Sequence, residues 1–328
     1  MKRLLVIQTA FIGDAILGTA LLEKLHQAYP EAKIDYLVRN GNQSLFDGHP
    51  LLNEVLIWNK QQSKYAGLWK MLQEVRKRNY DAVYNIQRYA ASGILTGFSG
   101  SKWKVGYQNN PFSFLFSKSV DHRFGKGFEN VHEVDRVLDL LESDQKRIIP
   151  KLYPTQRDFD AVKQYQSKPY VTIAPASVWF TKQFPAEKWV ELINQIPAQL
   201  NVFLIGGKSD KAVAEAIISN SQREVPDLTG KLRLLETAAL LKSAKMNFAN
   251  DSAPVHLASA VNAPITEVFC STVPEFGFTP LSENSHIIQT KEHLACRPCG
   301  MHGKSACPKG HFKCASTIDV TEIISVLA

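Results

Sequence analysis

Short apolar runs alternate with amphipathic stretches along both halves of the chain. In the first half this pattern predicts strands at 4–7, 34–38, 54–58, 82–86 and 104–107, and helices at 14–28, 65–78 and 131–141. In the second half it predicts strands at 170–174, 202–205, 246–249, 265–269 and 287–289, and helices at 185–196, 212–219, 234–243 and 254–261. Such alternation is typical of parallel sheets covered by helices on both faces. The sequence therefore predicts an α/β protein with two doubly wound domains.

A polar segment with two prolines separates the two series. It covers 149–167, contains Pro150 and Pro154, and includes a short polar helix. At 328 residues the chain exceeds the size at which a single core usually stops growing. We therefore expect two domains, 1–155 and 156–328, joined by this linker.

A polar loop between two apolar strands of the second half carries groups that could bind a ligand. Asp251 and Ser252 can cap the helix that follows, Pro254 suits its first turn, and His256 lies one turn further on. The unpaired N–H groups of such a helix start attract phosphate. The loop also follows the carboxyl end of a strand, where open α/β sheets bind ligands. We expect an anion-binding site here.

Two further loops follow predicted strands in the same way. In the first, Gly13 is expected to give the turn its freedom, and Asp14 opens a helix. A lone aspartate at this place can also be a simple helix cap. In the second, Ser177 and Lys182 lie between a strand and a helix. A lysine in such a place is most often a solvated surface residue.

Together these loops resemble glycosyltransferase family 9, the ADP-heptose:lipopolysaccharide heptosyltransferases, and in particular its heptosyltransferase II-like members. The family carries an Asp, a Ser or Thr, a Gly and, three residues later, a His, before a helix and an apolar strand that ends near a Thr and a Pro. The matching residues are Asp251, Ser252, His256, Thr272 and Pro274. Ala253 replaces the usual Gly, and its methyl group would narrow the pocket.

The resemblance also assigns roles to single residues. Asp14 occupies the place of the family's catalytic base, in its Gly-Asp pair. Lys182 and Ser177 match groups that face the diphosphate of the nucleotide sugar. Asp210 matches an acid that contacts the ribose.

For the whole chain the resemblance implies the GT-B fold, with two Rossmann-like domains facing a central cleft and a last helix, 318–328, that packs back toward the first domain. It implies inverting transfer of heptose from ADP-heptose to the lipopolysaccharide inner core, without a metal or another cofactor. The first domain would bind the acceptor glycolipid and the second the donor. No nucleic acid is expected as a partner.

The charge balance agrees with an anionic acceptor. Lys and Arg number 38 against 31 Asp and Glu, a net charge of +7, with basic clusters at 70–78, 102–104 and 118–126. An anionic glycolipid or the surface of the inner membrane would suit such clusters, although a solvated basic face is commoner. No apolar run is long enough to span a bilayer, and Asp14 interrupts the first one, which argues against a signal peptide. We expect a cytoplasmic protein, peripheral on the inner membrane.

The end of the chain is rich in cysteine, with His302 and His311 nearby. The four cysteines concerned are Cys296, Cys299, Cys307 and Cys314. Four thiolates could hold structural zinc; reduced thiols in a folded loop and redox chemistry are the alternatives. A disulfide is disfavoured in the cytoplasm. Cys270 ends an apolar run and is expected in the core.

Other functions have weaker support. The Asp158, Phe159, Asp160 sequence spells a metal-binding DxD, but it lies on the linker helix and is expected to be surface acids. An NAD-dependent dehydrogenase would need the GxGxxG spacing, which the loop after Gly206 lacks. A family 9 enzyme that uses another nucleotide sugar remains an alternative. So does a basic, zinc-tailed nucleic-acid-binding protein, which would bind in a salt-sensitive manner.

Overall fold

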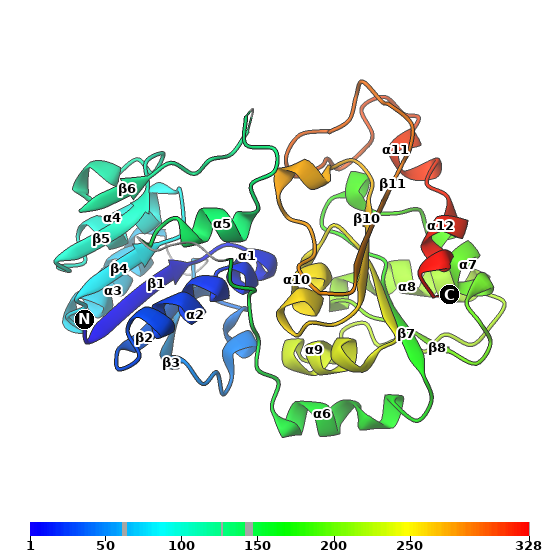
Figure 1. Ribbon diagram of the computed structural model, residues 1–328, viewed down its shortest axis with the longest axis horizontal. Coiled ribbons are helices and arrows are strands. Elements are labelled where there is room, and N and C mark those ends of the chain that lie inside the picture. The colour runs from blue at the N-terminus through cyan, green and yellow to red at the C-terminus, as the bar shows by residue number, and fades with distance from the viewer. Residues whose placement is uncertain (61–63, 126, 142–146, 328) are drawn as a thin grey trace. The chain divides into compact units, whose positions relative to one another are not determined.

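The chain forms two compact units, each built around one parallel sheet. The computed structural model describes residues 1–60, 64–125, 127–141 and 147–327. The units are Met1–Tyr153 and Pro154–Ala328. In each, helices cover both faces of the sheet (Figure 1). This confirms the predicted α/β class with two Rossmann-like, doubly wound sheets.

The first sheet has the strand order β3-β2-β1-β4-β5-β6, and all its pairs are parallel. Its strands are β1 (Arg3–Gln8), β2 (Lys33–Arg39), β3 (Leu52–Trp58), β4 (Ala82–Asn85), β5 (Trp103–Tyr107) and β6 (Lys118–Val120). The order reverses between β1 and β4, so a crevice is expected at their carboxyl ends.

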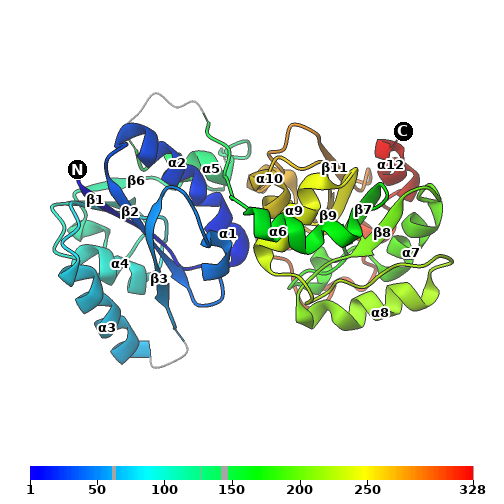
Figure 2. The ribbon, with the colours of Figure 1, turned by 90° about the horizontal axis from the view of Figure 1, so that it is seen from below.

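Helices pack on both faces of this sheet. They are α1 (Ile12–Leu17), α2 (Thr19–Ala28), α3 (Lys64–Lys77), α4 (Ala90–Gly97) and α5 (Glu133–Leu138), with short 3-10 turns η1 (Gln43–Phe46) and η2 (Ser113–Leu115). Figure 2 shows α3 and α4 on one face and α2 and α5 on the other. Under α3 and α4 lies an apolar core that includes Leu5, Ile7, Leu72 and Leu95. Burial of these side chains fixes the sheet beneath the helices.

The first helix differs from its prediction at Gly18, where another side chain approaches the backbone closely. A single helix over 14–28 was expected, but the structure breaks it at Gly18 into α1 and α2. A Cβ at Gly18 would lie 2.4 Å from the hydroxyl of Tyr36, which donates a hydrogen bond to the carbonyl of Ala15. The helix also begins at Ile12, so Gly13 is helical and the expectation that it forms the turn is wrong.

The second sheet has the order β11-β10-β9-β7-β8, again with parallel pairs. Its strands are β7 (Tyr170–Ala174), β8 (Asn201–Leu204), β9 (Met246–Asn250), β10 (Ile265–Phe269) and β11 (Ser285–Gln289). Here the order reverses between β7 and β9. The loops that follow these two strands are therefore placed for ligand binding.

The helices of the second unit are α6 (Gln156–Val162), α7 (Ala186–Gln195), α8 (Lys211–Asn220), α9 (Leu234–Ser243), α10 (Ala253–Ala260), α11 (Lys313–Ser316) and α12 (Val320–Ile324). Short 3-10 turns are η3 (Lys163–Tyr165), η4 (Phe180–Lys182), η5 (Lys208–Asp210), η6 (Pro274–Phe276) and η7 (Ser325–Leu327). Trp189 of α7 is fully buried in a core that α8 and α12 also cover. Cys270 lies in the same core, as predicted.

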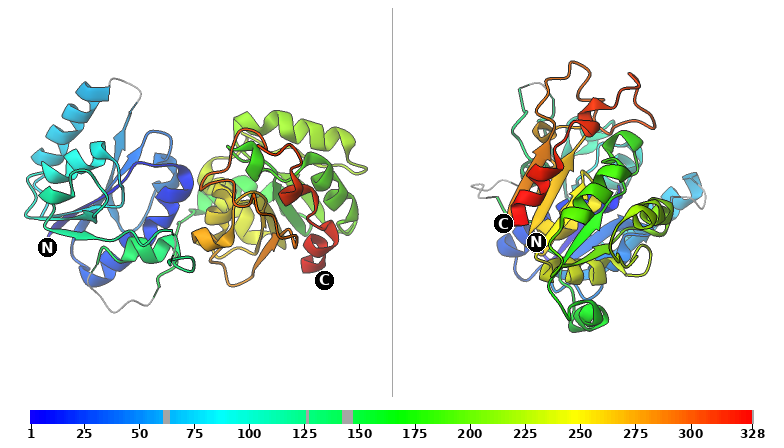
Figure 3. Two further views of the ribbon diagram at one scale, coloured as in Figure 1. Left: turned by 90° about the horizontal axis from the view of Figure 1, so that it is seen from above. Right: turned by 90° about the vertical axis from the view of Figure 1, so that its right-hand side faces the viewer.

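One expectation for the second unit needs correction, and another stays a prediction. Val320 and Ile323 of α12 pack with α7 in the core of the second unit (Figure 3), and the packing of the last helix toward the first domain stays a prediction. Residue 328 of the predicted segment lies outside the described residues. Asp158 is not a surface acid, because it is only 2% exposed. It accepts hydrogen bonds from the backbone N–H of Thr155 and from Arg233, so it is a structural group.

None of the helices in the described part of the chain has both the length and the apolar character that crossing a bilayer requires.

Candidate active site

An ion pair joins two of the predicted site residues. Lys182 ends the turn that follows β7, and Asp251 follows β9, the neighbouring strand. The Nζ of Lys182 lies 2.8 Å from Oδ2 of Asp251, and the two side chains are 15% and 11% exposed. The pair therefore lies at the point where the strand order reverses, as expected for a ligand site.

Hydroxyl groups tie this ion pair to a third loop. Thr272, which follows β10, donates a hydrogen bond to Oδ2 of Asp251 at 2.6 Å. Its neighbour Ser271 donates to the hydroxyl of Thr181 at 2.9 Å. Both Ser271 and Thr181 are buried. The loops after β7, β9 and β10 thus form one rigid, polar edge; Thr181 and Ser271 were missed from the sequence because single hydroxyl residues carry no pattern.

Helix α10 starts beside Asp251. Ser252 is its N-cap, in extended backbone geometry, and a proline stands in the first turn. The hydroxyl of Ser252 donates to the carbonyl of Asn250 at 3.2 Å and does not cap the helix N–H groups. His256 is buried one turn along. The helix start can therefore accept an anion.

A buried carboxyl group lies close to the same ion pair. Glu267 is in the middle of β10 and is 0% exposed. Neither of its carboxyl oxygens has a hydrogen-bond partner among the described residues. Burial raises the pKa of Glu267 well above its ordinary value, the charge of Asp251 adds to the increase, and Lys182 opposes it. The surroundings of Glu267 thus favour its protonated form. A lone acid inside a predicted strand was the signal that could have identified it.

The structure does not bring Ser177 and Asp210 into this hydrogen-bonded group. Ser177 is half-buried, and its carbonyl accepts a hydrogen bond from Gln183 at 2.6 Å. Asp210 accepts from the backbone N–H of Gly207 at 2.7 Å. A Cβ at Gly206 would lie 2.7 Å from the carboxylate of Asp210, so this loop needs glycine there. Their contacts with a nucleotide stay predictions.

Asp14 is the candidate base in the first unit. It is the third residue of α1, and it accepts a hydrogen bond from the backbone N–H of Phe11 at 3.2 Å. Burial and, after it, the negative charge of Glu133 together raise the pKa of Asp14 from 3.8 to about 6, whereas the hydrogen bond from Phe11 and the charge of Arg88 oppose the shift. A carboxylate with such a pKa can accept a proton near neutral pH.

Two cations lie beside the loop that leads to Asp14. Lys60 donates to the carbonyl of Thr9 at 2.9 Å, and Arg39 lies 5.0 Å from the ring centre of Phe11. Burial and the charge of Arg39 lower the pKa of Lys60. Neither cation pairs with a carboxylate among the described residues within 4.0 Å. Two unneutralised cations near one another attract an anion.

The cysteine-rich tail is hydrogen-bonded to loops that surround the ion pair of the second unit. The guanidinium of Arg297 donates to the carbonyls of Cys270 and Thr272, and the N–H of Cys299 donates to the carbonyl of Ser271 at 2.9 Å. The N–H of Lys304 donates to the hydroxyl of Thr181 at 2.8 Å. The tail therefore supports the loops after β7 and β10, which carry Lys182 and the Thr272 that donates to Asp251.

All cysteines of the tail are free thiols. The Sγ of Cys296 lies 3.7 Å from Nε2 of His311. Burial raises the pKa of Cys314 to about 11, whereas backbone N–H groups of residues 309–312 lower the pKa of Cys307. Across the described ranges, no three or more His, Cys, Asp or Glu side chains are gathered as ligands for one metal ion. Structural zinc, reduced thiols and redox chemistry therefore stay alternative predictions for these cysteines.

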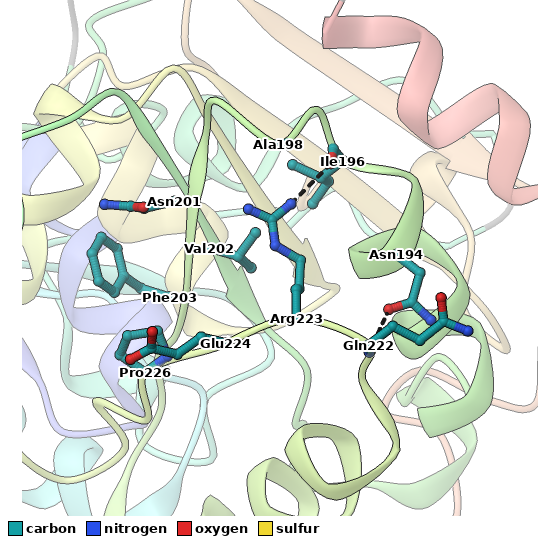
Figure 4. Close-up of a pocket in the computed structure, with 10 residues that line it drawn as sticks. All are labelled: Asn194, Ile196, Ala198, Asn201, Val202, Phe203, Gln222, Arg223, Glu224 and Pro226. Carbon is teal, nitrogen blue, oxygen red and sulfur yellow. Dashed lines mark hydrogen bonds between the residues drawn. The ribbon is translucent and has the colours of Figure 1, made fainter.

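A separate hollow of about 530 Å³ lies away from these groups (Figure 4). It is lined by the end of α7 and the segment after it, by the beginning of β8, and by residues 222–224 and 226. Arg223 in this hollow donates to the carbonyl of Ile196 at 2.8 Å, so its cation is engaged by the backbone.

Comparison with known proteins gives a consistent result. Residues 68–308 match the sequence profile described as glycosyltransferase family 9 (heptosyltransferase). The chain is 29% identical over 292 residues to lipopolysaccharide heptosyltransferase 3 of Escherichia coli, covering 84% of this chain and 85% of that protein.

Solved structures agree on the fold. The glycosyl transferase family 9 protein of Veillonella parvula superposes with a TM-score of 0.87 at 19% identity, over 99% of this chain and 97% of that one. The ADP-heptose lps heptosyltransferase II of Escherichia coli superposes with a TM-score of 0.79 at 20% identity, over 100% and 97% of the two chains. The two sheets are thus those of the GT-B class.

Proposed function

The chain belongs to glycosyltransferase family 9 and is a glycosyltransferase, and from this premise we propose that it transfers heptose from ADP-heptose to the lipopolysaccharide inner core. The observation that carries the proposal is the ion pair between Lys182 and Asp251 beside the start of α10. The cation and the free helix N–H groups suit a diphosphate, and the carboxylate suits a sugar.

In the donor site the diphosphate replaces Asp251 as the partner of Lys182. A phosphate oxygen offers Lys182 a charge-assisted contact, and the N–H groups of α10 add to it. Asp251 is then free to accept hydrogen bonds from sugar hydroxyls, while Thr272 holds its orientation. The name of the Escherichia coli heptosyltransferase II includes ADP-heptose, which supports this donor for the present chain.

In the transfer step Asp14 is the base. Its carboxylate takes the proton of the acceptor hydroxyl while that oxygen forms a bond to the anomeric carbon of the donor. The bond from this carbon to the diphosphate oxygen breaks on the opposite face, so the configuration inverts, and ADP leaves with the electron pair. Lys182 and the start of α10 stabilise the charge that develops on the diphosphate, so we propose that no metal takes part in the step.

Arg39 and Lys60 are proposed to bind the acceptor. They lie beside the loop of Thr9 to Phe11 that precedes Asp14, and they lack carboxylate partners among the described residues. Phosphates or acidic sugars of a lipopolysaccharide core would neutralise them. An acceptor embedded in the inner leaflet would hold the protein at the cytoplasmic surface of that membrane.

The proposal is tested with purified protein and a panel of nucleotide sugars. ADP-heptose with a heptose-deficient lipopolysaccharide core should release ADP and add one heptose to the core, as seen by mass spectrometry. The matched controls are ADP-glucose, UDP-glucose and GDP-mannose with the same acceptor. Transfer from one of these control nucleotide sugars, with none from ADP-heptose, would refute ADP-heptose as the donor. It would favour a family 9 enzyme that uses another nucleotide sugar.

A further inference from the structure

A second carboxylate lies on the helix that packs against the helix of Asp14. Glu133 is the first residue of α5, and α5 packs against α1, which carries Asp14. Its side chain is 12% exposed and lies 2.9 Å from Nη1 of Arg136 and 3.5 Å from Nε2 of His122. Burial would raise the pKa of Glu133, but the hydrogen bond and charge of His122 and the charge of Arg136 hold it below its ordinary value. Glu133 is therefore ionised at neutral pH.

The charged and titratable groups that act on Asp14 come from several elements. Glu133 comes from α5 and Arg88 from the segment after β4; Tyr36 of β2 lies close enough for the charge of Asp14 to raise the pKa of its hydroxyl. That hydroxyl donates to the carbonyl of Ala15, so it does not solvate the carboxylate. Of the two charged groups, Glu133 has the larger effect on Asp14.

We propose that Glu133 is a positioning residue of the transfer reaction, whose fixed negative charge strengthens Asp14 as an acceptor of the substrate proton. It acts through space on Asp14 and needs no contact with either substrate. A nearby negative charge makes the loss of a proton from a carboxyl group less favourable, and thus makes the carboxylate a stronger base. Arg136 and His122 keep Glu133 ionised and fixed. The inference rests on the proposed role of Asp14 as the base.

The test compares wild type with Glu133→Gln, which removes the charge and keeps the shape. The carboxyl of Asp14 is titrated by NMR on protein with 13C-labelled Asp carboxyl groups, and its signal is assigned with Asp14→Asn. We expect the midpoint to fall from about 6 by roughly half to one pH unit in the variant. The acid limb of kcat/KM should move by the same amount, a change that a purely structural role would not produce.

Two controls make the result specific. Glu129→Gln removes an exposed carboxylate four residues earlier, one that only binds the N–H of Gly127, and should leave the midpoint in place. Glu133→Asp keeps the charge and should retain most of the wild-type midpoint. An unchanged midpoint in Glu133→Gln, or an equal shift in Glu129→Gln, would overturn the proposal.

The readout also separates this inference from the proposed function. NMR reports the coupling of the two carboxylates even if no heptose is transferred, so a shifted midpoint without activity would refute the function alone. Should Glu133→Gln fail to fold, Glu133→Ala removes the same charge and is titrated in its place, and an unchanged midpoint of Asp14 in that variant would overturn the proposal.

Discussion

Lys182 and Asp251 neutralise each other across 2.8 Å, although they belong to loops that follow different strands. Thr272 donates to the same carboxylate oxygen, so Asp251 stays fixed when the lysine moves. A diphosphate that binds Lys182 must compete with this carboxylate. The ion pair therefore keeps the site ordered without donor. When the donor binds, its diphosphate replaces the Asp251 carboxylate as the partner of Lys182.

The first prediction concerns the cation of this pair. Lys182→Met should weaken ADP and ADP-heptose together, by about tenfold or more, because the diphosphate is common to both. The variant also leaves the carboxylate of Asp251 without its cation, which should lower the free energy of unfolding by about 3–5 kcal/mol. Calorimetry and chemical denaturation measure the two effects. The control is Lys188→Met, which removes a lysine paired with Glu191 on the outer part of α7.

A double variant separates the two effects. In Lys182→Met with Asp251→Asn the unpaired charge is gone, so stability should largely return while ADP affinity stays low. Wild-type affinity for ADP in Lys182→Met would refute the placement of the diphosphate.

The second prediction concerns Asp14. Asp14→Asn should keep its fold and its affinity for donor but lose about a hundredfold to ten-thousandfold in transfer rate. In the wild type, kcat/KM should fall as pH drops below about 6, because burial and Glu133 raise the pKa of Asp14 to that value and the protonated form cannot accept a proton. Asp47→Asn, at an exposed position of the same unit, is the control. Full turnover by Asp14→Asn would remove it from the mechanism.

The third prediction concerns the buried acid of β10. The pKa of Glu267 is higher in the folded protein than its ordinary value of 4.5, so the folded state keeps a proton that the unfolded chain releases. Its contribution to stability is therefore fully present below about pH 4.5 and is lost progressively as pH rises toward the folded pKa. A glutamine at this position has no proton to release, so Glu267→Gln should not lose stability in this way as pH rises.

Urea denaturation at two pH values measures the effect. The variant should gain roughly 1–3 kcal/mol over wild type at pH 8 and little at pH 4. Glu283→Gln, at an exposed position in the same unit, should change neither value. Equal differences between Glu267→Gln and wild type at both pH values would show that folding does not raise the pKa of Glu267.

Most of the fold could be predicted from the sequence, because its central strands are buried on both faces. Strands β7 and β10 and helix α9 have the predicted bounds, since a buried parallel strand is a continuous apolar run between polar loops. Helix α4 was missed because two glycines weaken its pattern, and β6 because it is only three residues long. The break at Gly18 was not predicted either, and the close approach of the Tyr36 hydroxyl to this residue is a tertiary contact that the local sequence does not report.

The candidate site could be predicted from the sequence only in part. Lys182 and Asp251 were each predicted from a loop after a strand, but their ion pair follows from the pairing of β7 with β9, which are not consecutive in sequence. The environment of Asp14 likewise depends on α5, which is far along the chain. Sequence patterns report local structure, whereas these charges meet through topology.

The fourth prediction concerns the acceptor. Arg39→Gln and Lys60→Gln should each raise KM for an anionic core acceptor several-fold and leave ADP affinity unchanged, because they lie in the first unit. The effect should diminish at high salt, since screening already weakens the attraction. Lys33→Gln is a matched control, because Lys33 is exposed at the opposite end of β2 from Arg39. An equal rise in KM for the control would indicate an effect of net charge alone.

The last prediction concerns the cysteine tail. Cys296, Cys299 and Cys307 are partly exposed, whereas Cys314 and Cys270 are buried. The first three should react with a thiol reagent in the native protein, and the other two only on unfolding. Cys307 should react fastest, because backbone N–H groups of 309–312 lower the pKa of its thiol, and Cys307→Ser should remove this fast phase.

The same titration decides between thiols and metal, and it links the tail to the donor site. Bound zinc would give about one metal equivalent per chain by elemental analysis and would protect the four tail cysteines together. Free thiols should give little metal and three reactive groups. Because Cys299 and Lys304 bind the loops of Ser271 and Thr181, alkylation of Cys299 should also weaken ADP binding. Alkylated protein that binds ADP as tightly as the untreated protein would show that these loops hold the donor site without the tail.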